Sequence, residues 1–426
     1  MRSIVVSLFM AAASGIAGAA DGASPPTVDL SALLDEVERA SPQLLATRAR
    51  AESADNAALQ RETLPDPKLS AAYTNDGLSS FTLGDSDFAN LALSWEQEVP
   101  SRAARARSAS VAQAEAGALR TSTESVKARL RARVITLFAE LWRLDGTKAL
   151  LEESRGLLAS GADAVQARYE SGDAIQESWL RAQAAARALD LELEALRLAR
   201  RQVELALAET LGRTEDPSFG PAAALPELAG SLDDDALAAA AVTASPEVLE
   251  RASLERVAQA RVDEARVQTQ PVFSWVAGYQ YRGSLDPMVS GGFSVRLPVR
   301  KDRNQARGIA GAELSRTAAG YDRLQSEILA RSGARGLVGE IASIDVRLRL
   351  YREAIVPQAE AAFESANAAF SSGRAEMFLV LDDLDRWVGT RKETLAWSAR
   401  RIGAIAALEA MTGIKLLEVS TPGRSQ

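Results

Sequence analysis

The spacing of hydrophobic positions changes between two periods along this chain. Through most of its length apolar residues recur every three or four positions, as in the stripe Val126, Leu130, Val134, Leu137 and Leu141. Such a stripe is typical of amphipathic helices that pack as coiled coils. In four short stretches apolar and polar residues instead alternate, which predicts β-strands. The strands are expected at about 69–74, 91–99, 272–282 and 289–297.

The longest helical stretches follow the strand pairs, at about 101–168 and 303–370. About 65 residues of helix, rising about 1.5 Å each, extend for roughly 100 Å, which is more than a globular domain needs. Turns centred on Gly172 and Gly373 are expected to reverse the chain into a second helix. The pattern therefore predicts a mainly helical rod or tube with a small β part.

The second half of the sequence follows the first at a nearly constant shift. Ser41 and Pro42 recur as Ser245 and Pro246, a shift of 204 residues (245 − 41). In both halves we expect the Ser to cap a helix that begins at the Pro, followed by strand, strand, long helix and helix. The predicted division is a first repeat at 20–212, a linker at 213–235, a second repeat at 236–413 and a C-terminal tail at 414–426.

One face of the predicted strands is apolar and rich in aromatic rings. The residues expected on this face are Leu91, Leu93, Trp95, Phe273, Trp275, Tyr279, Tyr281, Phe293 and Val295. The alternate positions are mostly Ser, Gly, Gln, Glu and Arg, which suit a water-filled interior. Tilted strands of this length cross a bilayer with such a face toward lipid, so we predict transmembrane strands. The alternative is a small soluble sheet that covers the end of the rod, with the rings as its core.

Four strands per chain cannot close into a barrel, and lipid tolerates no open strand edge. Eight strands, from two chains, would leave an interior filled by side chains, whereas twelve strands, from three chains, would enclose a conduit. The pattern therefore predicts a homotrimer with a twelve-stranded barrel.

The first residues are typical of a secretory signal. Arg2 gives a positive start, 4–13 is apolar, and Ala17, Gly18 and Ala19 offer a small-residue cleavage site. We expect a signal peptide at 1–19. The alternative, a membrane anchor, would need a longer apolar stretch.

The chain contains no Cys and no His among its 426 residues. This excludes Cys/His metal centres, Ser-His-Asp and Cys-His nucleophiles, and histidine acid–base catalysis. The formal net charge of −8 disfavours binding to nucleic acid. We expect no metal site, no cofactor and no enzymatic activity, because an enzyme would need a carboxylate pair that no motif supplies.

Together these features resemble the TolC-type outer-membrane efflux factors. They include the signal peptide, the two repeats, the Gly-centred turns and a Pro at each joint between strand and helix, namely Pro67, Pro100, Pro271 and Pro298. The segment RYESGDAIQESWLRAQ is the most similar single motif, and the resemblance covers essentially the whole mature chain. The segments LPDPKL and SWEQEVPSRAARAR are similar to the heavy-metal-resistance branch.

The resemblance implies that three chains build a β-barrel in the outer membrane, continuous with an α-helical tunnel through the periplasm. The tunnel would dock on a periplasmic adaptor protein and a proton-driven inner-membrane pump. The chain would conduct exported solutes passively, with metal cations as one class of cargo. The loops at 75–88 and 283–288 would face the exterior. The alternative function is that of a periplasmic adaptor, a structural coiled-coil protein of an envelope transport complex.

The resemblance also assigns roles to the two helical turns. It implies adaptor docking at Tyr169, Ser171, Gly172, Asp173, Phe370, Ser372, Gly373 and Arg374. The simpler interpretation is turn chemistry alone, with Gly at a positive φ.

Two acidic residues follow the second turn. Asp382 and Asp383 correspond to acidic residues that narrow the closed tunnel and bind cations in some family members, so they form a candidate periplasmic gate. Leu379 and Ala375 stand where the family has a carboxylate and a basic partner. The alternative for the two aspartates is a solvated charge pair on a helix face.

Three further aspartates, Asp76, Asp85 and Asp87, lie in the first predicted outer loop. A calcium or other metal site is one interpretation. Because their spacing matches no calcium-binding loop, an acidic surface loop is the expected one.

Overall fold

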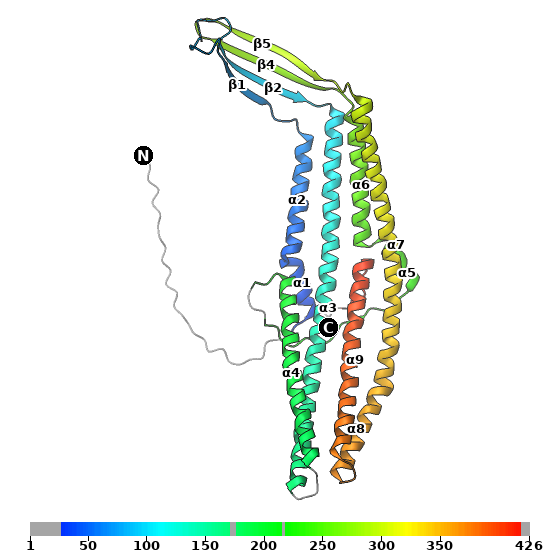
Figure 1. Cartoon of the computed structure of the whole chain (residues 1–426). Coiled ribbons are helices and arrows are strands. Elements are labelled where there is room, and N and C mark those ends of the chain that lie inside the picture. Colours follow the sequence, from blue (N-terminus) through cyan, green and yellow to red (C-terminus); the bar gives the residue numbers. More distant parts are fainter. Residues whose placement is uncertain (1–26, 171–175, 215–217, 419–426) are drawn as a thin grey trace, which may run out of the picture.

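The computed structural model describes residues 27–170, 176–214 and 218–418. The predicted signal peptide at 1–19 lies outside this part of the chain, as do Ser171, Gly172 and Asp173 of the first turn. The chain forms a long rod of helices, and a four-stranded sheet projects from one end of it (Figure 1).

The first half of the chain contains two short helices, a strand pair and two long helices. These elements are α1 (Leu30–Ala40), α2 (Pro42–Glu62), β1 (Lys68–Thr74), β2 (Asn90–Val99), α3 (Arg102–Glu170) and α4 (Gln176–Leu211). At about 1.5 Å per residue, the 69 residues of α3 extend for about 100 Å and set the length of the rod.

The second half also has two shorter helices, a strand pair and long helices, but its first long helix is divided and the short strands β3 and β6 are added. Its elements are β3 (Glu227–Leu228), α5 (Asp234–Thr243), α6 (Pro246–Val267), β4 (Val272–Arg282), β5 (Leu285–Arg296), η1 (Lys301–Gln305), α7 (Ala306–Leu350), η2 (Tyr351–Ile355), α8 (Val356–Ser371), α9 (Met377–Thr412) and β6 (Leu417–Glu418).

Ser41 and Ser245 stand at the N-cap positions expected at the two Ser-Pro pairs, but without the expected side-chain caps. Helices α2 and α6 do begin at Pro42 and Pro246, but neither Ser41 nor Ser245 makes a side-chain capping hydrogen bond. Both serines are buried at 2% exposure, where the chain turns sharply from one helix into the next. Because Pro lacks the N–H at the first helical position, fewer donors at these helix starts need a partner.

The second long helix is interrupted, whereas one continuous helix was expected over 303–370. A π-helical turn, η2, separates α7 from α8, and Pro357 is the second residue of α8. Proline has no N–H to donate, and its ring clashes with the carbonyl four residues earlier. The wider π turn just before Pro357 lets the helix axis continue past this clash.

The helices lie side by side in a fixed order. Near the sheet the order is α2–α3–α6–α7, and toward the far end it is α4–α3–α9 with α7 and α8 beyond (Figure 1). Thus α2 and α4 form one edge of the subunit, and α7 and α8 form the other.

The main hydrophobic core lies at mid-length, where α3 meets its neighbours. Phe138 and Leu141 of α3 are fully buried there, with Leu207 of α4, Ile341 of α7 and Ile405 of α9. Most of the predicted stripe on α3, from Val126 to Leu141, belongs to this core, which explains the coiled-coil spacing. A second core toward the helical turns contains Phe363 stacked on Trp387, with ring centres 5.5 Å apart.

The chain segments outside the long helices meet near the middle of the rod. The N–H of Val28 donates to the carbonyl of Pro221, and the N–H of Ala223 donates to the carbonyl of Val28, both at 2.9 Å. Strand β3 of the linker pairs with β6 after α9. These contacts join the start of the described chain, the linker and the C-terminal segment at one level.

The sheet is antiparallel throughout, in the order β1-β2-β4-β5. Three strands begin and end within one residue of their expected positions, but β5 begins at Leu285 and occupies most of the loop expected at 283–288. Gly283 (φ +66°) and Ser284 form a two-residue hairpin turn instead. Pro287 lies within this strand, and Pro is tolerated here because β5 is an edge strand in this chain.

Candidate functional site

The register of the sheet places all nine predicted apolar residues on one face. Residues directly opposite in antiparallel strands share a face, so each row of partners can be followed across the sheet. From the helical end outward the rows are Val99–Phe273–Val295, Gln97–Trp275–Phe293, Leu69–Trp95–Ala277–Gly291, Ala71–Leu93–Tyr279–Val289 and Tyr73–Leu91–Tyr281. From Phe273 to Tyr281 this face extends for about 26 Å along the strand.

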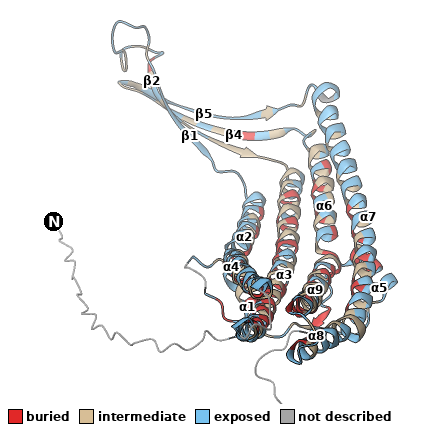
Figure 2. Ribbon diagram, turned by 60° about the horizontal axis from the view of Figure 1, so that its bottom comes forward, coloured by how far each residue is buried: buried red, intermediate tan, exposed pale blue. Residues whose placement is uncertain are grey.

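This apolar face is open to solvent in the single chain. Trp275 is 57% exposed, Phe293 69% and Val289 82%, and the rings of Trp275 and Phe293 contact each other at 6.3 Å between centres. The opposite face carries Ser, Gln, Glu and Arg, and on β2 and β4 it is the less exposed of the two (Figure 2). A sheet with its rings outward and its polar groups inward has the reverse polarity of a soluble sheet that covers a core.

Within the described residues of the single chain, both edge strands of the sheet lack a partner on their outer side. β1 pairs only with β2, and β5 pairs only with β4. Open edges expose a row of backbone donors and acceptors that another strand can pair with. Because strand direction alternates across the four strands, β5 of one copy can pair antiparallel with β1 of another.

The loop between β1 and β2 is ordered by a network around Asn75. Its Nδ2 donates to the carbonyls of Gly77 at 2.8 Å and Ser80 at 2.7 Å, and its Oδ1 accepts from the N–H of Thr82 at 3.0 Å. Arg282 of β4 fastens the loop from the other hairpin, donating to Asp87 Oδ1 at 2.8 Å.

Two of the three aspartates of this loop contribute to its folding. Asp87 pairs with Arg282, and Asp76 accepts a hydrogen bond from Ser86 at 2.5 Å. Within the described residues no group of three or more Asp and Glu is placed so that it could hold a metal ion.

The second helical turn closes α8 through hydrogen bonds of its own. Ser372 Oγ donates to the carbonyls of Ala368 at 3.1 Å and Ala369 at 3.0 Å, and Arg374 Nε donates to Ser372 Oγ at 2.9 Å. Gly373 has a φ of +74°, which Gly adopts without strain. Turn chemistry therefore accounts for Gly373, while Ser372, Gly373 and Arg374 remain exposed at the end of the rod.

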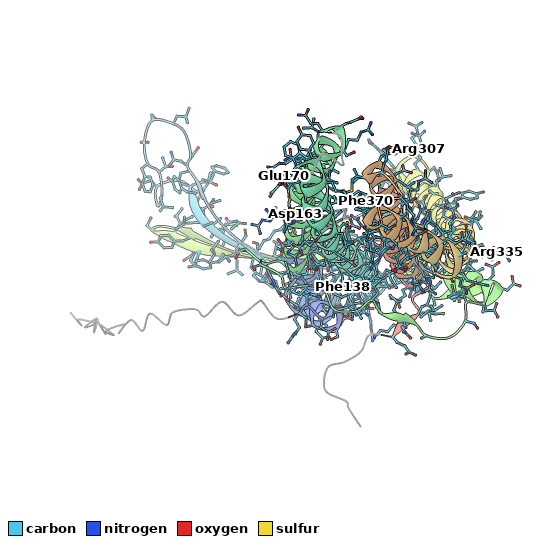
Figure 3. All side chains as sticks on the ribbon, turned by 90° about the horizontal axis from the view of Figure 1, so that it is seen from below. Phe138, Asp163, Glu170, Arg307, Arg335 and Phe370 are labelled. Atoms are coloured by element: carbon cyan, nitrogen blue, oxygen red, sulfur yellow. The ribbon has the colours of Figure 1, made fainter. Side chains whose placement is uncertain are left out.

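The two turns are joined by arginine–aromatic contacts. The guanidinium of Arg168 lies 4.8 Å from the ring centre of Phe370 and donates to the carbonyl of Ser371 at 3.4 Å. Arg181 of α4 lies 5.2 Å from the ring of Phe378 on α9. Figure 3 views this end, with Glu170 at the end of α3 and Phe370 at the end of α8 on neighbouring hairpins. The sequence prediction named Phe370 but missed both arginines.

Phe370 and Tyr169 have different surroundings, although both were predicted to dock the adaptor. Phe370 is 6% exposed beneath Arg168, so its ring stabilises the turn, whereas Tyr169 is 45% exposed. A sequence signal could have identified Arg168 and Arg181. Both are basic residues close to a chain reversal, and an aromatic residue lies close to the other reversal.

The candidate gate residues lie on the first turns of α9. Asp382 Oδ2 pairs with Arg386 Nη2 at 3.0 Å, one helical turn along the same helix. Both side chains are well exposed, at 41% and 69%. Asp383 is partly buried beside this pair. In one chain the two aspartates therefore form a solvated charged patch near the turn.

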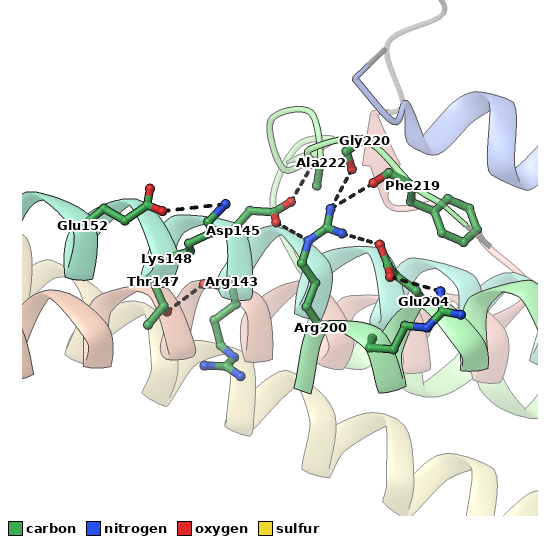
Figure 4. Close-up of polar contacts among 11 residues, drawn as sticks. Arg143, Asp145, Thr147, Lys148, Glu152, Arg200, Glu204, Phe219, Gly220 and Ala222 are labelled. Atoms are coloured by element: carbon green, nitrogen blue, oxygen red, sulfur yellow. Dashed lines mark hydrogen bonds and ion pairs between the residues drawn. The ribbon is translucent and has the colours of Figure 1, made fainter. Parts of the chain in front are cut away.

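An ion cluster anchors the linker to the middle of the rod (Figure 4). Arg200 of α4 donates to Asp145 of α3 at 2.7 Å and to the carbonyls of Phe219 and Gly220 at 3.1 and 3.0 Å. Asp145 also accepts from the N–H of Ala222 at 2.9 Å. Burial alone would lower the pKa of Arg200, but its carboxylate partners outweigh burial and raise this pKa.

A second ion pair joins α1 to α3 nearer the sheet, at Lys127 and Arg131. Glu38 accepts from Lys127 at 2.8 Å and from Arg131 at 2.7 Å. Burial alone would raise the pKa of Glu38, but the hydrogen bonds and charges of Lys127 and Arg131 outweigh it and lower this pKa. The carboxylate therefore stays ionised where it holds α1 against the long helix.

None of the helices in the described part of the chain is both long enough and apolar enough to cross a membrane.

Solved structures of outer-membrane channels share this fold. VceC, an outer membrane protein from Vibrio cholerae, is 18% identical with a TM-score of 0.73, over 90% of this chain and 96% of that one. The Campylobacter jejuni CmeC outer membrane channel is 12% identical with a TM-score of 0.75, over 96% and 94%. CusC, described in connection with transmembrane channel formation, is 13% identical with a TM-score of 0.75, over 91% and 92%. No family model and no curated protein matches the sequence.

The predicted resemblance to TolC-type outer-membrane channels is thereby confirmed for the fold. The match extends over at least nine-tenths of the chain in all three cases, so it includes both the sheet and the rod.

Proposed function

We propose that this chain is the outer-membrane channel of a tripartite efflux system, located in the outer membrane and extending into the periplasm. The observation that supports this most is the reversed polarity of the sheet. Five rows that are apolar and aromatic except at Gln97 lie on the more exposed face, while the alternate face is mostly polar. Lipid contact stabilises such an outer face, and water in a lumen solvates the inner one.

Three copies would close the wall as a homotrimer. Each copy supplies four strands, and alternating strand direction allows β5 of each copy to pair with β1 of the next. The closed wall would have twelve strands, enough to leave a water-filled interior. Directly beneath, the edge helices would continue the wall as a tunnel. The tandem repeats at 20–212 and 236–413, with the linker at 213–235, are part of this proposal.

The two helical turns would be the docking end. Tyr169, Ser372, Gly373 and Arg374 lie exposed there, at the end of the rod farthest from the sheet. A periplasmic adaptor would bind these turns and connect the channel to a proton-driven inner-membrane pump. The channel would conduct solutes passively, because the pump supplies the free energy.

Purification separates this proposal from its alternatives. The full chain should require detergent for extraction, should have the mass of three copies, and should form ion-conducting pores in planar lipid bilayers. A monomer that is soluble without detergent and does not conduct would overturn the proposal. An adaptor without a barrel would wash off membranes without detergent, and nothing in the described chain explains exposed rings on such a protein.

The class of cargo is tested in cells. Because two sequence segments are similar to the heavy-metal-resistance branch, we propose metal cations as cargo. Deletion of the gene should then lower the tolerated concentration of metal salts more than that of drugs. Sensitivity to drugs alone would contradict metal cargo and leave the channel proposal standing.

A further inference from the structure

A pocket of about 550 Å³ lies where the rod meets the sheet. Its walls are the last turns of α2 and α6 and the first turns of α3, and the segments that lead into β1 and out of β2 close it toward the strands (Figure 1). Charged side chains line it from four segments, namely Arg61 of α2, Asp66 before β1, Arg105 of α3 and Glu264 of α6. The pocket therefore combines two cations and two anions from separate parts of the chain.

The four charges of the pocket have no ion partner in the folded chain. None of them forms an ion pair with another described residue. Neighbouring charges on the same helices do, since Arg107 of α3 pairs with Asp263 of α6 at 3.6 Å. The charges around the pocket therefore remain available to a ligand.

Arg105 in particular lacks a good acceptor. Its Nη1 donates to the carbonyl of Glu62 at 3.4 Å, which is long for a hydrogen bond, and its buried Nε has no acceptor among the described residues. A buried charged donor without an acceptor is destabilising. An anionic oxygen in the pocket would supply the acceptor, and the planar guanidinium favours the paired oxygens of a carboxylate or phosphate.

The pocket opens on the face of α3 that is turned away from α1 and the linker. Arg131, Phe138 and Asp145 are spaced by seven residues, and this row meets α1, the main core and the linker. Arg105 and Ser108, which both line the pocket, precede Arg131 by 26 and 23 residues (131 − 105 and 131 − 108). At about 3.5 residues per turn, both lie nearly half a turn from the row.

In the proposed trimer this face of α3 is turned toward the lumen. The linker and the C-terminal segment add a layer at mid-length, and three such layers would block the passage if they lay inside it. The sheet indicates the same direction independently. Asp66 and Pro100 line the pocket two residues beyond Lys68 and Glu98, which lie on the polar face, and alternate residues share a face. The pocket therefore opens into the proposed passage, directly beneath the barrel.

From these relationships we infer that the pocket is a binding subsite, inside the passage, for exported solutes that carry a carboxylate or phosphate group. Arg61 and Arg105 bind the anionic oxygens, and the hydroxyl of Ser108 donates a further hydrogen bond to them. Asp66 and Glu264 receive a cationic group of the same solute and keep the binding of purely anionic solutes weak. Weak binding suits conduction, because a solute must also leave the site. This inference rests on the proposed channel, and metal cargo would use the subsite as a complex with carboxylate ligands.

Block of single channels tests the subsite, with inorganic phosphate as the probe. The full chain is purified in detergent and inserted into planar bilayers, and phosphate replaces chloride at constant ionic strength. The channel conductance, divided by the conductivity of the solution, should fall and then level off as phosphate rises, because a binding site saturates.

Substitutions then assign the block to the two arginines. Arg61→Gln and Arg105→Gln should each raise the half-blocking concentration of phosphate by about tenfold, the loss expected for one hydrogen bond between charged groups. The matched control, Arg107→Gln, removes the same charge from the same turn of α3 but lies outside the pocket. It should leave the half-blocking concentration unchanged.

A change of lipid distinguishes a solute from a membrane headgroup, because both can supply a phosphate group. The wild type is recorded in bilayers of phospholipid and in bilayers of monoolein, which contains no phosphate. Equal block in the two supports a subsite for solutes. Block in monoolein alone would show that a phospholipid headgroup fills the pocket, and would overturn the inference.

Two further results would overturn the subsite and leave the proposed function intact. One is a conducting wild type without saturating block, and the other is an equal shift of the half-blocking concentration in Arg105→Gln and Arg107→Gln. A wild-type chain that does not conduct at all would overturn both the subsite and the proposed function.

Discussion

Arg168 at the end of α3 covers the ring of Phe370 at the end of α8, with 4.8 Å between the guanidinium carbon and the ring centre. Two residues separated by about half the chain thus join the two helical hairpins at their turns. Arg181 and Phe378 repeat the arrangement one helix farther along, at 5.2 Å. Leu379 and Ala375, which stand where the resemblance implies a carboxylate and a basic partner, lie at the same end of the rod.

We expect Arg168→Ala to loosen this end of the channel. A cation–π contact of this kind contributes about 0.5–1 kcal/mol, and three copies would lose it together. Bilayer recordings should show a several-fold higher open probability, with trimers formed normally. Arg168→Lys, which keeps the charge, should have a smaller effect. An equal open probability for the wild type, Arg168→Ala and Arg168→Lys would refute a role of Arg168 and Phe370 in closing the channel.

Gly373→Val should weaken coupling to the adaptor without preventing assembly. At a φ of +74° a β-branched side chain costs about 1–2 kcal/mol, so the turn must change its backbone conformation. Efflux measured by substrate accumulation should fall, while the amount of trimer in the outer membrane stays at the wild-type level. Gly373→Asn, which tolerates this region, is the control. Unchanged efflux in the Val variant would show that this turn does not dock.

Phe293→Arg should block assembly of the barrel, whereas Ser294→Arg should not. The two residues are neighbours on β5 but point to opposite faces of the sheet. An arginine facing lipid costs about 2–4 kcal/mol near the bilayer centre, while one facing a water-filled lumen costs little. Heat-modifiable trimers in outer-membrane fractions provide the measurement. Similar trimer yields for the two variants would contradict the lipid-facing assignment.

Asp382→Asn should reduce the preference of the open pore for cations, and Arg386→Gln should increase it. The two side chains neutralise each other at 3.0 Å in this structure, so removal of either changes the charge of the ring that three copies would form. Reversal potentials in asymmetric salt across a bilayer measure the effect. Identical reversal potentials for wild type and both variants would show that the pore does not narrow at this level.

The ion pair of Glu38 should make part of the stability depend on pH. The pKa of Glu38 is lower in the folded chain than in the unfolded one. The ion pair therefore stabilises the fold fully above the unfolded pKa of about 4.3. This stabilisation disappears as the pH falls through the folded pKa. The free energy of unfolding of the Glu38→Gln variant should therefore be lower than that of the wild type by about 0.5–1 kcal/mol at pH 7. The difference from wild type should shrink below about pH 4, as followed by thermal unfolding in detergent. A difference that is constant from pH 7 to pH 3 would contradict the assignment.

Local periodicity predicted much of the secondary structure, because hydrophobic spacing reflects which side of a helix or strand is buried. The alternation in β2 and β4 identified the two faces of the sheet, and the stripe from Val126 to Leu141 identified the long helix and its core side. Where a residue had two local interpretations, the prediction failed. Pro287 was interpreted as part of a loop and lies in an edge strand, and Ser41 was interpreted as a cap and lies buried in a bend.

The sequence by itself determined the secondary structure, the faces of the strands and the resemblance to outer-membrane channels, since each depends on residues close together in the chain. Only the tertiary structure decided that β2 pairs with β4, that Arg168 covers Phe370, and that α4 and α7 form opposite edges of the subunit. The physical reason is distance along the chain. Hydrophobic spacing shows whether a residue is buried or solvated, but it does not show which distant segment buries it.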